Sequence, residues 1–347
     1  MRPQGCQETG LCGRLCSNPL EGLPQLADFK PVCPLIVLTL SKTGAYTHQM
    51  PTRIALAALG VVAALILCPV APFAQAIQKV MYVSVVDAAG APVADLKPSD
   101  FLVREDNAPR EVLSVAPADD PMQLAVLADN TQAARNFIRD IRVGLEGFVT
   151  DMLNGTKNEI SIIGLAERPT ILANVSSDRA AVLKGVYRIF EMPASGSYLL
   201  DALIDVGKGF SKREAKRPVV VVLTTEGPEF SSRRYEDVLK PLDDLGAALH
   251  VVVLGPPSND ISEDSRNRSA VLDEGPRKSG GARESLLAGS ALPGSLKRLA
   301  ADLKHQYRVT YARPQSLIPP ERATVSATRP GLTARGTLIK DRPQARP

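Results

Sequence analysis

Tryptophan is absent from this chain of 347 residues, and aromatic side chains make up only 4% of it. Surfaces that bind single-stranded nucleic acid usually stack bases on aromatic rings, so this scarcity argues against such a function. The charge is nearly balanced, with 41 basic and 37 acidic residues, whereas a nucleic-acid interface needs a concentrated basic face. We therefore expect no nucleic-acid partner. The apolar share of 44% is typical of a folded globular protein.

Cysteine and histidine are scarce where the fold is expected. All five cysteines lie within the first 68 residues, and they lack the CxxC pairs of a zinc site. After residue 68 only His250 and His305 remain as histidines. We expect His250, inside an apolar run, to be a core or strand-end residue and not a catalytic base. The motifs GxGxxG, GxxxxGK[ST] and GxSxG are absent, so neither a nucleotide cradle nor a serine-hydrolase elbow is indicated.

Residues 50–76 have the parts of a secretory signal peptide. They contain a basic Arg53, an apolar stretch at residues 54–67 and an Ala-Gln-Ala cleavage pattern. The apolar stretch is shorter than the roughly 20 residues of a membrane span, which disfavours the alternative of a retained anchor helix. Residues 1–49 precede a complete signal, so we expect them to be a non-native upstream extension. The mature chain would be periplasmic or secreted, with no membrane span after signal removal.

Short strands open the mature chain. Residues 80–86, 101–105 and 111–115 have strand-like patterns, and turn residues separate them. We expect a small antiparallel β module over residues 77–116. So few strands are not stable alone, and the module must pack against another part of the chain.

From residue 117 strands alternate with helices, which predicts a three-layer α/β/α sandwich with a mainly parallel sheet over residues 117–313. The run PVVVVLTT at residues 218–225 has the consecutive β-branched residues of a strand buried on both faces. By the same patterns we expect further strands at residues 123–128, 160–165, 170–175 and 249–254, and helices at residues 131–153, 178–190, 197–210, 235–248 and 296–305.

Three further stretches lack the clear alternation of strands and helices. Residues 256–293 are rich in polar residues and glycine, and we expect a long, mobile loop there. We expect the basic run at residues 212–217 to form a solvated loop. Residues 314–347 should form a C-terminal strand and a tail.

Polar residues follow several of the predicted parallel strands. In such sheets ligands bind beyond the carboxyl ends of the strands, so residues 129, 194–197 and 225–227 should lie at one edge. Hard divalent cations such as Mg²⁺ prefer oxygen ligands. Two carboxylates and two hydroxyls would meet at this edge, namely Asp129, Thr131, Ser197 and Glu226.

Several motifs occur in one order along the mature chain. They are SDFLVRED in an early strand, LAVLADNTQAA, SGSYLLDAL, VVVVLTTEGPEFSS, KRLAADLKHQYRVTYARP and TVSATRPGLTAR. This ordered set resembles a von Willebrand factor A (VWA)-type domain, in the form of the bacterial VWFA-related domain family of Acidobacteria. The resemblance covers most of the mature chain. It implies a VWA fold and an adhesion site of the MIDAS type, in which Mg²⁺ (or Mn²⁺ or Ca²⁺) captures an acidic side chain of a partner protein.

The metal motif of that family, DxSxS, is incomplete in this chain. Asp129 is kept and Thr131 replaces the first serine, but Ala133 replaces the second and has no oxygen. Ser197 stands where the family has threonine, and Glu226 stands where it has the shorter aspartate. Because Mg²⁺ requires a nearly ideal octahedron, these changes should weaken binding. Without a metal, Asp129 and Ser197 would act as helix N-caps and Glu226 as a solvated carboxylate.

These observations predict a non-enzymatic, extracytoplasmic VWA-type module that binds a protein, with a degenerate metal site for adhesion. Two alternatives remain open. A periplasmic hydrolase could use a metal-bound water at the same edge, with Glu226 as its general base. A structural envelope protein with an inactive metal site would also fit, and Ala133 favours it over the adhesive function.

Overall fold

The structure is a computed structural model that describes residues 76–315, 318, 320 and 322–340. Runs of β-branched residues form its central strands. β8 (Pro218–Thr225) is buried along its whole length, and β5 (Gln123–Ala128) and β9 (Ala248–Leu254) run parallel to it on either side. The six-stranded sheet has the order β10-β9-β8-β5-β6-β7. Its outer strands are β10 (Arg283–Leu286), β6 (Glu159–Gly164) and β7 (Thr170–Ser176), of which β7 runs antiparallel to β6.

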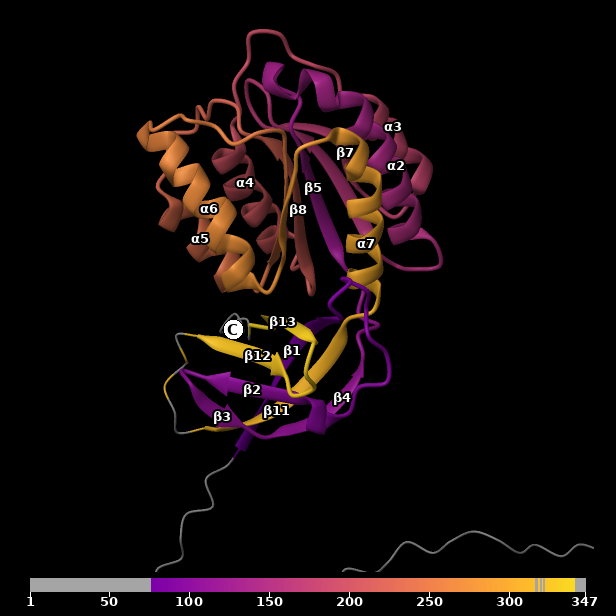
Figure 1. Cartoon of the computed structure of the whole chain (residues 1–347), viewed down its shortest axis with the longest axis vertical. Coiled ribbons are helices and arrows are strands. Elements are labelled where there is room, and N and C mark those ends of the chain that lie inside the picture. The colour runs from indigo at the N-terminus through magenta and orange to yellow at the C-terminus, as the bar shows by residue number, and fades with distance from the viewer. Residues whose placement is uncertain (1–75, 316–317, 319, 321, 341–347) are drawn as a thin grey trace, which may run out of the picture. The chain divides into compact units, whose positions relative to one another are not determined.

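Helices cover both faces of this sheet because successive residues of each central strand point to opposite sides (Figure 1). Leu124 and Val126 of β5 pack with η2 (Gln132–Phe137), α2 (Ile138–Leu153), α3 (Arg179–Tyr187) and α7 (Leu292–Lys304), which follows the short η3 (Gly289–Ala291). Ala125 and Leu127 pack on the other face with α4 (Leu199–Lys212), α5 (Tyr235–Asp244) and α6 (Glu263–Ser279). The predicted three-layer α/β/α sandwich with a mainly parallel sheet is confirmed.

The stretch at residues 256–293 is not the long loop that we expected. It contains α6 and the edge strand β10, which pairs with β9. α6 is mostly polar, carries Pro276 within it and buries a narrow face that includes Arg268, Val271 and Leu272. So few apolar residues give a weak 3.6-residue pattern, and for that reason the sequence did not indicate a helix.

Strands from both ends of the described chain form the antiparallel part. One sheet has the order β13-β1-β11-β4 and the other β12-β2-β3. The bounds are β1 (Ala76–Val86), η1 (Pro98–Asp100), β2 (Phe101–Glu105), β3 (Ala108–Arg110), β4 (Val112–Pro117), β11 (Tyr307–Pro314), β12 (Ala323–Ala327) and β13 (Thr333–Leu338). Their common core includes Met81, Val83, Val103, Val309 and Tyr311.

The strands after α7 belong to this antiparallel part. Our expected boundaries gave the module residues 77–116 and assigned residues 307–313 to the α/β part. In the structure β11 pairs with β1 from Ala76↔Pro314 to Val83↔Tyr307, and β12 pairs with β2. A local pattern identifies a strand but not its partner, and here the partner lies at the opposite end of the chain.

Arg217, at the end of the basic run at residues 212–217, is buried and joins the two parts. We expected a solvated loop, yet this side chain is only 3% exposed. Its guanidinium donates to the carbonyl oxygen of Ala118 (3.0 Å) and to Oε1 of Gln306 (2.6 Å). Gln306 Nε2 in turn donates to Ser84 Oγ of β1 at 2.9 Å. A hydrogen-bonded network therefore links β8 to the antiparallel part.

The predicted upstream extension at residues 1–49 lies outside the described residues. So does the predicted signal peptide at residues 50–76, except for Ala76, the first residue of β1. Within the described ranges, no helix combines the length and the apolar character needed to cross a membrane.

Candidate functional site

Three chain segments meet at the carboxyl-end edge of the six-stranded sheet. We call this edge the rim and define it by residues 129–133, 194–198 and 225–231. Thr131 forms a β-bridge with Met192, and Ser197 forms one with Glu229. The backbone N of Ser197 also donates to the carbonyl oxygen of Pro228 at 2.9 Å. The structure thus brings together the segments that parallel-sheet topology predicted to converge.

Asp129 joins the ends of two strands. It directly follows β5 and is 1% exposed. Its Oδ1 accepts hydrogen bonds from N and Oγ1 of Thr131 at 2.9 and 2.7 Å. Its Oδ2 accepts from N and Oγ1 of Thr225 at 2.9 and 2.6 Å. Four donors therefore compensate for the burial of this carboxylate.

Ser197 presents a buried hydroxyl at the rim. The residue is 2% exposed, and its Oγ has no hydrogen-bond partner among the described residues. α4 begins at Leu199 with Tyr198 in the N-cap position, so Ser197 does not have the capping role considered for it. The ring of Phe230 covers this turn, because a Cβ atom at Gly196 would lie 2.6 Å from it.

Glu226 is held by ion pairs and is not a solvated carboxylate. Its Oε2 lies 3.3 Å from Nη1 of Arg268, and its Oε1 lies 3.9 Å from Nη2 of Arg283. Arg268 comes from α6 and is only 1% exposed. It also donates to Thr224 Oγ1 at 2.9 Å and to the carbonyl oxygen of Thr225. The residue that supports the end of β8 therefore comes from a helix that the sequence did not indicate.

Glu229 is the second carboxylate beside Arg268. It is 5% exposed, and its Oε2 lies 3.6 Å from Arg268 Nε. Burial raises the pKa of Glu229 above its ordinary value, while the hydrogen bond from Ser231 and the charge of Arg268 oppose that shift. Sequence reasoning missed this pair, although the spacing of residues 268, 271, 272 and 275 follows one helical face.

The predicted metal ligands do not form a donor set that fits Mg²⁺. Both oxygens of Asp129 already accept two hydrogen bonds each, and Glu226 is paired with Arg268. Ala133 offers no oxygen, and a Cβ atom at Gly227 would lie 2.6 Å from its methyl group. In the described part of the chain, no cluster of three or more His, Cys, Asp or Glu side chains could hold a metal ion. An octahedral ion needs more free oxygens than this rim presents.

The rim also lacks the partner that would turn Ser197 into a nucleophile. A serine is activated by an adjacent base, usually histidine. His250 lies near the start of β9, away from its carboxyl end, and His305 follows α7. Among the described residues, Ser197 Oγ thus has no base within hydrogen-bond reach.

No protein-family model and no curated protein matches the sequence. Among solved structures, the chain is similar to the conserved hypothetical protein BatB from Bacteroides thetaiotaomicron, with 13% identity and a TM-score of 0.42 over 53% of this chain and 99% of that one. It is similar to the VWA domain of SpRpn10, with 12% identity and a TM-score of 0.40 over 51% and 94% of the two chains. It is also similar to the proximal thread matrix protein 1 of the mussel byssus with a zinc-occupied MIDAS motif, with 11% identity and a TM-score of 0.43 over 60% and 50%. These similarities concern the fold alone.

Proposed function

We propose that this protein is an extracytoplasmic VWA-type interaction module that binds a protein partner at the rim without a metal ion. The hydrogen bonding of Asp129 carries this proposal, because Thr131 and Thr225 already occupy both oxygens of its carboxylate. Arg268 supplies the positive charge beside Glu226 and Glu229. The hydrogen bonds of Asp129 and the ion pairs of Arg268 then order the rim without a bound cation.

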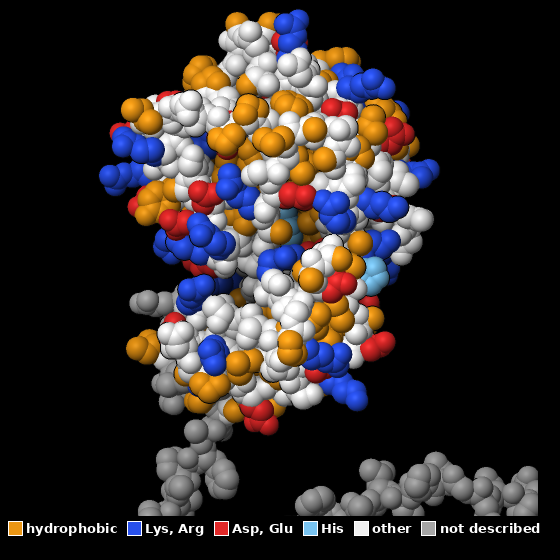
Figure 2. Space-filling model, in the orientation of Figure 1, with side chains coloured by type: hydrophobic (Ala, Val, Ile, Leu, Met, Phe, Trp, Pro, Cys, Tyr) orange, Lys and Arg blue, Asp and Glu red, His pale blue; other side chains and the backbone are white. Residues whose placement is uncertain are grey.

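Two exposed phenylalanines lie next to this polar centre. Phe190 is 60% and Phe230 is 52% exposed. The carbonyl oxygen of Phe190 accepts a hydrogen bond from Asn130 Nδ2 at 3.2 Å, and the backbone N of Phe230 donates to the carbonyl oxygen of Ser197 at 2.8 Å. Hydrophobic side chains are visible among charged ones at this end of the α/β part (Figure 2). Aromatic anchors often carry much of the energy of protein interfaces, so these two rings are the proposed contacts.

Photo-crosslinking of the full chain in its natural host tests the rim as the binding surface. The crosslinker p-benzoylphenylalanine replaces Phe230 in one variant and the exposed Val143 of α2 in a matched control. We expect a specific cross-linked partner from position 230 and none from position 143. The affinity for that purified partner should fall about tenfold or more in Phe190→Ala and Phe230→Ala, and EDTA should not change it.

Two results would contradict the proposal. Equal cross-linking from both positions, or unchanged affinity in both phenylalanine variants, would remove the rim from partner binding. Binding that is lost in EDTA and restored by Mg²⁺ would show a working metal site at the rim.

Export is the second component of the proposal. It rests on the signal-peptide pattern at residues 50–76. Mass spectrometry of the protein isolated from its host should find a first residue near Ile77. An intracellular chain that retains residues 50–76 would contradict export.

A further inference from the structure

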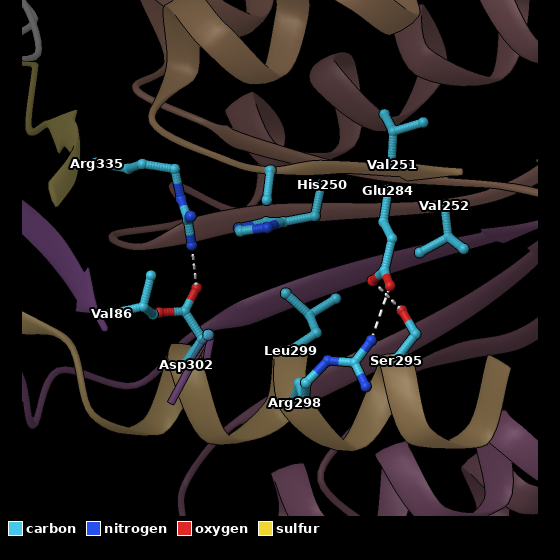
Figure 3. A pocket seen from close by; sticks show the side chains of 12 residues that line it. Val86, His250, Val251, Val252, Glu284, Ser295, Arg298, Leu299, Asp302 and Arg335 are labelled. Carbon is cyan, nitrogen blue, oxygen red and sulfur yellow. Dashed lines mark hydrogen bonds and ion pairs between the residues drawn. The ribbon is translucent and has the colours of Figure 1, made fainter. Parts of the chain in front are cut away.

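A cavity of about 130 Å³ lies between α7, the β9–β10 edge of the six-stranded sheet, and strands of the antiparallel part. Two polar groups line it, one on each side (Figure 3). His250, Asp302 and Arg335 form one group, and Glu284, Ser295 and Arg298 form the other. Leu299 lies between the two groups, while Val86 lies beside Asp302 and Val252 beside Glu284 (Figure 3).

The polar group around Glu284 has its hydrogen bonds satisfied. Ser295 Oγ donates to Glu284 Oε2 at 2.5 Å, and Arg298 Nη2 donates to Glu284 Oε1 at 2.7 Å. This carboxylate is therefore neutralised by its own arginine. It offers little attraction to a further cation.

The polar group around His250 is not satisfied. His250 is 1% exposed, and neither ring nitrogen has a hydrogen-bond partner among the described residues. Arg335 Nη2 donates to Asp302 Oδ2 at 2.7 Å, but Asp302 Oδ1 and Arg335 Nε are buried without a partner there. Buried polar atoms are nearly always hydrogen-bonded in folded proteins, so four such atoms at one cavity point to a bound molecule.

The chemistry of these four atoms defines what would satisfy them. Burial keeps the imidazole of His250 uncharged, so one ring nitrogen donates and the other accepts. Arg335 Nε is a second donor and Asp302 Oδ1 a second acceptor. Each arginine at the cavity is already paired with a carboxylate, so a charged ligand would lack a counter-charge. The ligand must therefore be neutral and must both donate and accept.

Size and wall chemistry distinguish a small molecule from ordered water. One water needs only about 15 Å³ of such space, and a water molecule is held by polar contacts on several sides. Here the valine and leucine walls offer none. A molecule with a polar head and a short apolar body matches both surfaces.

We propose that this cavity binds a small neutral molecule with a carboxamide-like head, which pairs with His250, Asp302 and Arg335 while its short apolar body lies against Val252 and Leu299. A primary carboxamide has two N–H donors and a carbonyl acceptor, which can serve Asp302 Oδ1, Arg335 Nε and the nitrogen of the His250 ring that faces them. Because Arg335 comes from β13 and the other two residues from the α/β part, the ligand would join the two parts of the structure.

Titration of the full mature chain with propionamide tests this site, and propionate of the same size is the charged control. We expect saturable shifts of the ¹⁵N signals of the His250 ring and a rise in Tm with propionamide, and no such response to propionate. His250→Phe should lose the saturable response. His305→Phe, a matched change at an exposed histidine, should keep it.

A wild-type chain whose His250 ring signals do not respond to propionamide overturns the proposal. An equal response in His250→Phe, or an equal response to propionate, also overturns it. If His250→Phe does not fold, the binding site of propionamide is located in the wild-type protein instead. Nuclear Overhauser effects between the propionamide methyl group and the methyl groups of Val252 or Leu299 support the site, and contacts only elsewhere contradict it.

Discussion

Thr225 donates two hydrogen bonds to Oδ2 of Asp129, from its backbone N at 2.9 Å and from its Oγ1 at 2.6 Å, although the two residues lie 96 positions apart. These bonds join the carboxyl ends of the neighbouring strands β5 and β8. The carbonyl oxygen of Thr225 also accepts a hydrogen bond from Arg268 of α6. Thr225 thus connects Asp129 to the helix whose Arg268 pairs with Glu226 and Glu229.

Removal of the Thr225 hydroxyl should destabilise the protein. Thr225→Val keeps the side-chain shape but removes a hydrogen bond to a buried carboxylate, which costs about 1.5–3 kcal/mol of the free energy of unfolding. Urea denaturation measures this loss. Thr170→Val is the matched control, since the hydroxyl of Thr170 bonds to a backbone carbonyl at an exposed position, and it should change stability by less than about 0.5 kcal/mol. Equal losses in the two variants would contradict the role assigned to Thr225.

Mg²⁺ should leave the thermal stability of the EDTA-treated wild type unchanged. A ligand that binds only the folded chain adds about 2.7 kcal/mol at a hundred times its Kd, which raises Tm by several degrees. The rim lacks free oxygens for such a site, so we expect no rise in calorimetry. A Tm that increases with Mg²⁺ in the wild type but not in Asp129→Ala would restore the metal-binding role predicted from the sequence.

Arg268→Met should destabilise the protein by about 3–5 kcal/mol, because it leaves the buried Glu229 without its cation and Glu226 with only the more distant Arg283. The loss should be smaller at acidic pH. Burial raises the pKa of Glu229 in the folded chain, so the folded chain holds this proton more tightly and stability falls as pH rises through that range. Removal of Arg268 takes away a charge that lowers the pKa of Glu229, so this pKa rises further in the variant. Protonation of Glu229 at acidic pH then recovers part of the lost stability.

Arg266→Met on the same helix provides the control for Arg268→Met. Arg266 is exposed, and its removal should cost less than about 0.5 kcal/mol at any pH. Chemical denaturation of both variants at several pH values measures the difference. A deficit in Arg268→Met that is as small as the control's, or that grows toward acidic pH, would argue against a charge-neutralising role for Arg268.

Acid should destabilise the wild type partly through His250. Burial, together with the smaller effect of the nearby charge of Arg335, lowers the pKa of His250 from 6.5 to about 3. Below pH 6.5 the unfolded chain binds a proton that the folded chain refuses, so this contribution to stability is complete above that pH and is lost as the pH falls toward 3. Relative to near pH 7, the loss should reach about 2–3 kcal/mol near pH 4.5.

His250→Leu should remove this part of the acid sensitivity. The unfolding free energy of the wild type should therefore fall relative to that of His250→Leu as the pH decreases from about 7 to 4.5. His305→Leu, at an exposed position, should keep the profile of the wild type. Parallel pH profiles for wild type and His250→Leu would show that His250 does not couple folding to acid.

Local patterns predicted much of the α/β part. The bounds of β8 agree with the expected residues 218–225, because a run of β-branched residues favours a strand whatever surrounds it. The meeting of Asp129, Ser197 and the end of β8 also followed from the sequence, since strands joined by crossover helices run parallel and end at one edge. These conclusions depend on residues close together in the chain.

Only the tertiary structure decided what the rim residues do. Glu226 pairs with Arg268 in place of a solvent or a metal, and that arginine comes from a polar helix with a narrow apolar face. Arg217 lies in a buried network although it ends a basic run, and β11 pairs with β1 from the opposite end of the chain. Periodicity determines which residues form a helix or strand and which face is apolar. The partner of a charge or of a strand edge depends on which surfaces meet after the chain has folded, and that is set by long-range packing.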